Sequence, residues 1–318
     1  MAKINLLILS MLVSIFVSAQ ATVSEQSVVL QTDTGDIFGT LRVPPSDTTV
    51  PVVLIIAGSG PTDRNGNNPQ MQNNSLKMLA KSLYHSQIAS LSFDKRGVAE
   101  SASSAIAEID LRFEDFINDV RGWIDLLAQD ERFTEIIVAG HSEGALIGKV
   151  AAQNNANVAK FISIAGAGAS AGDILREQLS AQLAGQQAIE DLLFSFIDQL
   201  ENGETVENIP PMFYALFRPS VQPYLISWFK YNPQTEIAKL DIPILIVNGT
   251  TDIQVSVAQA ELLAAAQPNA QKVIIENMNH VLKTIEATDM MSQMATYTNP
   301  TLPINSELVE RIVGFVRE

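Results

Sequence analysis

The sequence predicts an α/β fold, in which a mostly parallel β-sheet is flanked by helices. From residue 51 onward, apolar β-type runs alternate with helical runs, which is the pattern of right-handed βαβ units. The run Pro51 to Ala57 is apolar throughout, as expected for a strand that is covered on both faces. Another strand run, Ile136 to Ala139, leads through a glycine-flanked turn with Ser142 at its apex into a helical run. We therefore expect a parallel sheet that carries chemistry at the ends of its strands.

The predicted elements follow the chain in order. Residues 27–32 and 37–43 are β-rich runs on either side of Asp33-Thr34-Gly35-Asp36, a hairpin signal, so the sheet should open with an antiparallel pair. The strands expected next are 51–57, 88–93, 135–139, 160–165, 242–248 and 272–276. The helices expected between and after them are 75–86, 113–129, 143–153, 257–266 and 306–316.

The alternation of strands and helices is interrupted between about residues 167 and 236. This block has helical runs at 174–184, 187–201 and 211–229, so we expect a helical cap insert over one edge of the sheet. The insert is rich in aromatic residues, including Phe213, Phe217 and Trp228. Two interpretations remain open: these side chains line an apolar pocket for an acyl or aryl group, or they form the insert's own core.

The N-terminal residues 1–20 have the pattern of a secretory signal peptide. Lys3 supplies the positive charge, residues 6–17 the apolar stretch, and the small residues around Ala19 a cleavage site. The alternative is an uncleaved anchor, but about twelve apolar-rich residues are too few where about 20 are needed to cross a bilayer. We therefore expect an exported, periplasmic or secreted protein, in which residues 21–318 form one α/β domain with its insert and no stable membrane insertion.

The composition excludes several classes of function. The chain has 35 acidic and 20 basic residues, a net charge of −15, which argues against binding nucleic acid or an anionic membrane. It has no cysteine, so disulfides and thiol catalysis are excluded. We find no metal-ligand motif and no P-loop, and the segment 166–171, which fits a dinucleotide fingerprint, follows a late strand instead of opening the fold. We expect neither a metal nor a cofactor; the composition does not indicate an oligomeric state.

Two segments match the pattern G-x-S-x-G of a nucleophilic serine. In residues 140–144 only two residues separate the strand run from Ser142, so the turn is tight and lifts the hydroxyl above the sheet. In residues 168–172 four residues separate the preceding strand run from Ser170, which places this serine on a loose loop before a helix that Asp173 is expected to cap. The tight turn favours Ser142 as the nucleophile.

A serine needs a base, and the chain has three histidines. His85 lies late in a polar-faced helical run, and His141 adjoins Ser142 on a turn that should direct its side chain elsewhere. His280 lies in a loop after the last strand, which makes it the expected base. The carboxylate that orients it should follow an earlier strand, as Asp252 does, with Glu276 as the alternative. The order Ser142, Asp252, His280 is that of an α/β-hydrolase.

The tetrahedral intermediate of acyl transfer requires two backbone N–H donors. Glu143, the residue after the nucleophile, supplies one, and we expect Ser59 in the loop after the run 51–57 to supply the other. The same loop carries Asp63 and Arg64. Arg64 either binds a carboxylate of the substrate or belongs to a structural ion pair that holds the loop.

Five motifs together resemble a known group of enzymes. They are Ala57-Gly58-Ser59-Gly60-Pro61-Thr62-Asp63-Arg64-Asn65-Gly66-Asn67, Asp94-Lys95-Arg96-Gly97-Val98-Ala99-Glu100-Ser101, the turn at Ser142, Gly249-Thr250-Thr251-Asp252 and Asn279-His280. On these motifs the chain resembles bacterial exported α/β-hydrolases of the serine aminopeptidase-like and esterase D-like group. Many members have His-Gly where this chain has Ala57-Gly58. The resemblance implies hydrolysis of carboxylic esters.

The function expected from these observations is that of a serine carboxylesterase, which cleaves small to medium acyl or aryl esters of small molecules through a Ser-His-Asp triad. A serine peptidase of the prolyl or aminopeptidase type and a thioesterase use the same triad and remain alternatives. A non-catalytic binding protein on this fold would normally show a broken triad, and this sequence shows none.

Overall fold

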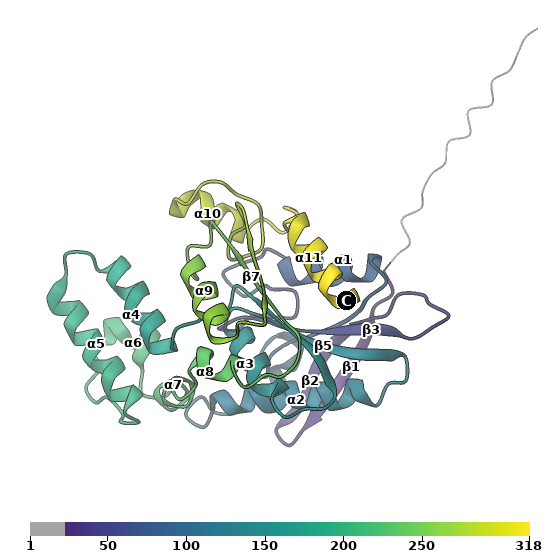
Figure 1. The fold of residues 1–318 in the computed structure, drawn as a ribbon. Helices are drawn as coiled ribbons and strands as arrows, with labels where there is room; N and C mark the ends of the chain where they lie inside the picture. The colour runs from purple at the N-terminus through teal and green to yellow at the C-terminus, as the bar shows by residue number, and fades with distance from the viewer. Residues whose placement is uncertain (1–22) are drawn as a thin grey trace, which may run out of the picture.

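A computed structural model describes residues 23–318 and shows one eight-stranded sheet with helices on both faces (Figure 1). The predicted signal peptide, residues 1–20, lies outside the described residues. The strands are β1 (Gln26–Thr32), β2 (Gly35–Arg42), β3 (Val50–Ile56), β4 (Ala89–Phe93), β5 (Phe133–His141), β6 (Val158–Ile164), β7 (Ile244–Gly249) and β8 (Gln271–Ile275). Their order across the sheet is β1-β2-β4-β3-β5-β6-β7-β8.

The sheet opens with an antiparallel hairpin and continues in parallel, which confirms the predicted fold class. β1 pairs with β2, Thr32 lies opposite Gly35 across a two-residue turn, and β2 pairs antiparallel with β4. All pairs from β4 onward are parallel. The carboxyl ends of β3 to β8 therefore lie along one edge of the sheet, where loops from distant parts of the chain meet.

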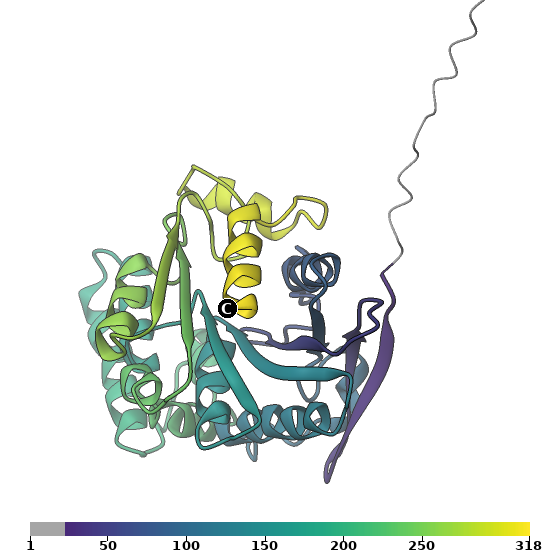
Figure 2. The same cartoon turned by 45° about the vertical axis from the view of Figure 1, so that its right-hand side comes forward.

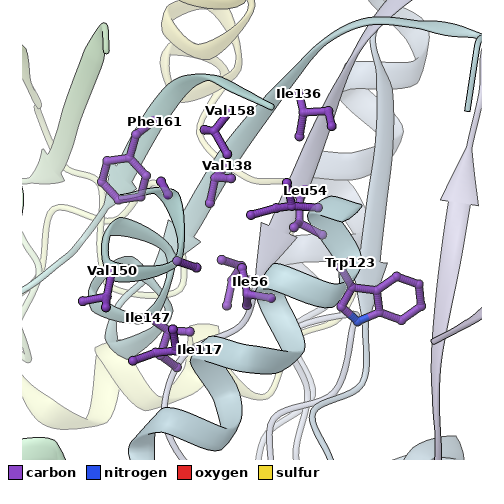
Figure 3. Close-up of a cluster of buried hydrophobic side chains, with 14 of the residues drawn as sticks. Leu54, Ile56, Ile117, Trp123, Ile136, Val138, Ile147, Val150, Val158 and Phe161 are labelled. Atoms are coloured by element: carbon purple, nitrogen blue, oxygen red, sulfur yellow. The ribbon is translucent and has the colours of Figure 1, made fainter. Parts of the chain in front are cut away.

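Alternating side chains of each central strand enter two separate cores. Val52, Leu54 and Ile56 of β3 join a core beneath α2 (Phe113–Ala128), α3 (Glu143–Ala152) and α9 (Val257–Ala266) (Figure 3). Val53 and Ile55 join a core beneath α1 (Ser75–His85) and α11 (Ser306–Arg317), the dark blue and yellow helices on one side of the sheet in Figure 2. A strand buried on both faces has no polar side, which explains the continuous apolar run in the sequence.

Only helices connect β6 to β7 in the described chain. They are α4 (Ala171–Gln182), α5 (Gln187–Glu201), the 3₁₀ turn η2 (Pro211–Phe213), α6 (Tyr214–Phe217), α7 (Gln222–Phe229) and α8 (Pro233–Ile237). We call residues 167–236 the cap insert. In Figure 1 its helices lie to the left of the sheet. Its buried apolar side chains form a third cluster, which includes Leu193, Phe196, Ile197 and Leu200.

The predicted single helix 211–229 is wrong, because prolines divide it. Arg218 precedes Pro219 and has an extended backbone, with ψ 146°, as the ring of a following proline requires. Pro223 then occupies the first turn of α7, where its missing N–H costs nothing. The other predicted helices and strands are present, with their ends shifted by at most three residues.

Two further elements were not predicted from the sequence pattern. The 3₁₀ turn η1 (Ala99–Ser104) follows β4, and α10 (Met290–Tyr297) begins at Asp289, whose side chain accepts a hydrogen bond from the N–H of Ser292. None of the helices within residues 23–318 combines the length and the apolar character that crossing a membrane requires.

Candidate active site

The loops after β3, β5, β7 and β8 bring the predicted site residues together at the carboxyl edge of the sheet. Ser59 follows β3, Ser142 follows β5, Asp252 follows β7 and His280 follows β8. Ser59, Ser142 and His280 line one small cleft. Residues separated by more than 200 positions in the chain thus meet because parallel strands end at the same edge.

Ser142 has a strained backbone between strand and helix. Its φ of 55° and ψ of −123° lie outside the regions that L-residues favour. Two close approaches require glycine on either side of it. A Cβ on Gly140 would lie 2.1 Å from the carbonyl oxygen of Gly144, and a Cβ on Gly144 would lie 2.5 Å from that of Ala57. The turn therefore holds the serine at the junction of β5 and α3.

Ser170, the other candidate nucleophile, has a structural role at the start of α4. It is the N-cap residue of α4: its hydroxyl accepts a hydrogen bond from the N–H of Asp173 and donates one to the Asp173 carboxylate at 2.7 Å. The prediction that Asp173 caps this helix is therefore wrong, since Ser170 occupies the cap. Its φ of −59° shows none of the strain of Ser142.

His280 and Asp252 form a buried pair. Nδ1 of His280 lies 2.8 Å from Oδ2 of Asp252. The other carboxylate oxygen of Asp252 accepts backbone N–H bonds from Gln254 and Val255, at 2.8 and 2.9 Å, which hold the carboxylate in place. With the proton on Nδ1, Nε2 of His280 is free to accept a proton. The alternative carboxylate, Glu276, is exposed, and the carboxylate in contact with His280 is Asp252.

His141 was expected to point away from the site, and the structure corrects this. Its ring is buried beside that of His280, with centroids 4.9 Å apart, and its Nε2 lies 2.8 Å from the carbonyl oxygen of His280. Burial and, to a smaller extent, the neighbouring His280 lower the pKa of His141 to about 4, so the ring is neutral at pH 7. Neutral His141 with its proton on Nε2 donates this bond and anchors the loop that carries His280. Its position next to Ser142 was the only signal in the sequence.

Two backbone N–H groups next to Ser142 are free of hydrogen bonds to other residues in the described range. Glu143 is the first residue of α3, where an N–H has no partner within the helix, and Ser59 lies in an irregular loop. Both residues also line a larger cavity that Ser142 borders. These are the positions at which the sequence predicted the oxyanion donors.

The side chain of Glu143 takes part in a buried network that the sequence analysis missed. It lies 3.5 Å from Nζ of Lys95 and accepts a hydrogen bond of 2.5 Å from the hydroxyl of Tyr224. Burial raises the pKa of the Tyr224 hydroxyl well above its ordinary value, and the charge of Glu143 raises it further, so Tyr224 stays protonated and donates. The signal for this network in the sequence was Lys95 within the motif 94–101.

Arg64 does not contact the cleft, so its role as a substrate-binding residue is corrected. Its guanidinium is buried and lies 2.6 Å from the Asp94 carboxylate and 2.7 Å from that of Glu100. Asp94 also accepts the backbone N–H of Arg64 at 2.8 Å. Arg64 thus ties the loop after β3 to the loop after β4, and its partners are Asp94 and Glu100 instead of Asp63.

Two cavities meet beside Ser142, and only one of the three predicted cap aromatics borders them. The first, of about 270 Å³, includes Ser142 and Leu175 in its lining; the second, of about 520 Å³, includes Phe116. Trp228 lines both cavities, at their junction. Phe217 is fully buried in the apolar cluster of the cap insert and Phe213 packs against that cluster, so for these two residues the core interpretation holds.

No metal site accompanies this arrangement in the described part of the chain. Residues 23–318 contain no group of three or more His, Asp or Glu side chains placed to hold a metal ion.

Comparisons with known proteins find sequence similarity to hydrolases. Residues 72–199 match the family described as "Serine aminopeptidase, S33". Among curated proteins, the chain is similar to Esterase EstD of Thermotoga maritima, with 22% identity over 249 residues. That alignment covers 77% of this chain and 57% of the relative, so the chain spans little more than half the length of this relative.

Several solved esterase structures have the same fold. Est1E from Butyrivibrio proteoclasticus superposes with a TM-score of 0.59 at 16% identity, covering 92% of this chain and 99% of Est1E. A second structure of Est1E, with ferulic acid bound, has the same TM-score and identity and covers 92% and 100%. The esterase Pf2001 of Pyrococcus furiosus gives 0.58 at 15% identity, covering 93% and 91%.

Proposed function

We propose that this chain, an α/β-hydrolase similar to the serine aminopeptidase-like and esterase D-like group, is a serine carboxylesterase. The observation that carries the proposal is the strained turn at Ser142, which shares a cleft with the Asp252-paired His280. A nucleophile, a base held in one tautomer and a carboxylate that orients it are the parts that acyl transfer needs.

In the proposed reaction, the hydroxyl of Ser142 attacks the ester carbonyl carbon while His280 accepts its proton. The oxyanion then accepts hydrogen bonds from the backbone N–H groups of Ser59 and Glu143. When the C–O bond breaks, the alcohol leaves with the proton from His280, and the acyl group stays on Ser142. Water attacks this acyl-enzyme with His280 as its base, releasing the carboxylic acid and restoring the serine.

The charges around the cavities favour an ester over a peptide with a free amino terminus. An aminopeptidase needs a carboxylate that is available to bind the α-ammonium group of its substrate. The carboxylates that line the two cavities are those of Glu143 and Glu108. Glu143 is engaged by Lys95 and Tyr224, and Glu108 forms an ion pair with Arg218.

The cavity linings support a substrate with an apolar acyl or aryl group. Leu146, Ile174 and Trp228 line the smaller cavity and Ile106, Phe116 and Trp228 the larger. The apolar parts of these linings bind such groups by excluding water. The fold relative Est1E holds ferulic acid, a small aryl acid, in one of its structures, which agrees with this size class.

A fluorophosphonate probe, which labels only activated serines, tests the nucleophile. We expect labelling of the wild-type protein and its loss in Ser142→Ala, together with a loss of turnover of about 10⁴-fold or more. Ser170→Ala is the matched control and should retain labelling and activity, since Ser170 caps a helix. Labelling that persists in Ser142→Ala and disappears in Ser170→Ala would exchange the two assignments and refute the proposal.

A substrate panel separates the esterase from its alternatives. p-Nitrophenyl esters of increasing acyl length, matching thioesters and amino-acid arylamides should be compared by kcat/KM. We expect the oxygen esters to be the best substrates. A preference for the arylamides would establish a peptidase instead. Glu143 would then have to give up its contacts with Lys95 and Tyr224 when the substrate binds.

A further inference from the structure

One hydrogen bond lies behind the predicted oxyanion donor of Ser59. The ammonium of Lys95 donates to the carbonyl oxygen of Gly58 at 2.6 Å. This carbonyl and the N–H of Ser59 belong to the same peptide group. In a trans peptide the C=O and N–H bonds point in opposite directions, and no cis peptide occurs in the described residues. Lys95 therefore binds the carbonyl oxygen of the peptide group whose N–H faces the cleft.

The sheet order makes this contact possible. β4, β3 and β5 are neighbours in the sheet, so the residues that follow them lie side by side at its carboxyl edge. Lys95 follows β4, Gly58 follows β3 and Glu143 follows β5. Lys95 is buried, its Nζ lies 5.3 Å from the centre of the Phe116 ring, and its charged partner is Glu143. Carbonyl, carboxylate and ring face together surround the ammonium.

Glu143 has two roles at this place. Its backbone N–H is the second predicted oxyanion donor, and its carboxylate balances the charge of Lys95. Burial lowers the pKa of Lys95 and the negative charge of Glu143 raises it again, so the carboxylate favours the charged ammonium. Tyr224 of α7 donates to the other carboxylate oxygen, which connects the cap insert to the same network.

We propose that Lys95 is a positioning residue of the oxyanion hole, which fixes and polarises the peptide between Gly58 and Ser59 so that its N–H donates strongly to the transition state. The inference rests on the proposed function. Glycines flank Ser59 on both sides, so without Lys95 this peptide has little to prevent it from rotating. A cation at the carbonyl oxygen also draws electron density from the amide, which strengthens the N–H as a donor.

Removal of the ammonium tests the proposal. In Lys95→Met we expect kcat for a short p-nitrophenyl ester to fall about 10- to 100-fold with KM changed less than about threefold, since deleting a whole donor costs about 10²- to 10³-fold. Lys149→Met is the matched control: it replaces another buried lysine of this chain, one that does not contact the Gly58 peptide, and should retain the wild-type kcat.

A second variant separates positioning from folding. Lys95→Met alone leaves the Glu143 carboxylate without its cation, which destabilises the protein. The double variant Lys95→Met with Glu143→Gln removes both charges and keeps the backbone N–H of residue 143. We expect it to unfold at a temperature closer to that of the wild type, while its kcat remains as low as that of the single variant.

Binding of a trifluoromethyl ketone provides a readout that a purely structural role would not change. Its adduct with Ser142 places an oxyanion in the hole, whereas the corresponding trifluoromethyl alcohol has a similar shape and forms no adduct. In the double variant, the inhibition constant of the ketone should rise by the factor by which kcat/KM falls, and that of the alcohol should stay the same.

Each outcome decides the inference. Unchanged ketone affinity and kcat in the double variant would overturn it, and so would an equal loss of affinity for ketone and alcohol, which would indicate a collapsed cavity. In either case, fluorophosphonate labelling of Ser142 in the same variant would leave the proposed function intact. Failure of the proposed function would appear separately, as labelling that survives Ser142→Ala.

Discussion

Lys149 of α3 is buried, and its ammonium has no hydrogen-bond partner among residues 23–318. Burial lowers the pKa of Lys149 to about 7, although the charge of Glu236 acts in the opposite direction. Between about pH 7 and the ordinary lysine pKa of 10.5, the unfolded chain therefore binds a proton that the native state does not. The free energy of unfolding should rise with pH across this window, and the full penalty applies below it.

We predict that Lys149→Met stabilises the protein at pH 7. An unsatisfied buried donor costs about 1–3 kcal/mol, and methionine fills a similar volume without one. The gain should shrink as the pH is raised from 7 to 10, because the wild type becomes more stable over that range. Urea unfolding at several pH values measures both effects. A variant that is less stable at pH 7 would show that Lys149 contributes a favourable interaction with Glu236.

Among single residues, the sequence predicted some members of the site and not others. Ser142, Asp252 and His280 were selected by their positions after strands, which depend only on the order of elements. The contact of His141 with the His280 loop and that of Lys95 with Gly58 depend on side-chain directions and on which strands are neighbours. β4 lies next to β3 and β3 next to β5, an order that the succession of elements along the chain does not contain.

The elements of the cap insert show what pattern analysis leaves open. An aromatic run predicts burial, but it does not say whether a ring faces the insert's core or the substrate. The prolines at 219 and 223 divide the run 211–229 into separate helices; Phe217 of α6 is buried, whereas Trp228 of α7 lines the cavities. Of the cap residues predicted to bind substrate, two therefore belong to the insert's packing.

We predict that Trp228→Ala and Phe217→Ala have different effects. Trp228 lies at the junction of the two cavities, so its loss should alter the dependence of kcat/KM on acyl length, with each added CH₂ normally contributing about 0.8 kcal/mol or about fourfold. Phe217→Ala should leave that profile intact and lower stability by about 3–5 kcal/mol.

Kinetics on p-nitrophenyl acetate to octanoate, together with thermal unfolding of both variants, distinguish these effects. The acetate serves as the control, since its acyl group is too short to extend far into either cavity. If Trp228→Ala lowered stability and left the chain-length profile unchanged, Trp228 would belong to the packing of the cap insert, as Phe217 does.

For the whole molecule, the alternation of strands and helices was sufficient to predict the fold. Each buried strand is apolar on both faces, so its run is continuous and easily recognised, and each parallel pair requires a long crossover connection, which is usually a helix. The antiparallel start was marked by its turn residues. The strand order remained undetermined, because packing between layers sets it.

Export is also a property of the whole chain, and we propose it from the sequence of residues 1–20. The mature protein should begin near Gln20 or Thr22 and be found outside the cytoplasm. Mass spectrometry of the protein from a cell-envelope fraction measures its first residue. Leu9→Arg, which interrupts the apolar stretch, should abolish processing. Recovery of residues 1–15 on the wild-type protein from that fraction would contradict the proposal.

The network of Lys95, Glu143 and Tyr224 has a consequence for how this chain can evolve. Substitution of Lys95 alone leaves a buried carboxylate without its cation, and substitution of Glu143 alone leaves a buried ammonium without its anion. Either substitution, made first, therefore destabilises the protein. The position after the nucleophilic serine is thus constrained by a partner in the loop after β4. A lineage that loses this pair has to pass through a less stable ancestor or replace both residues together. Its cap insert must also accommodate the loss of the carboxylate to which Tyr224 donates.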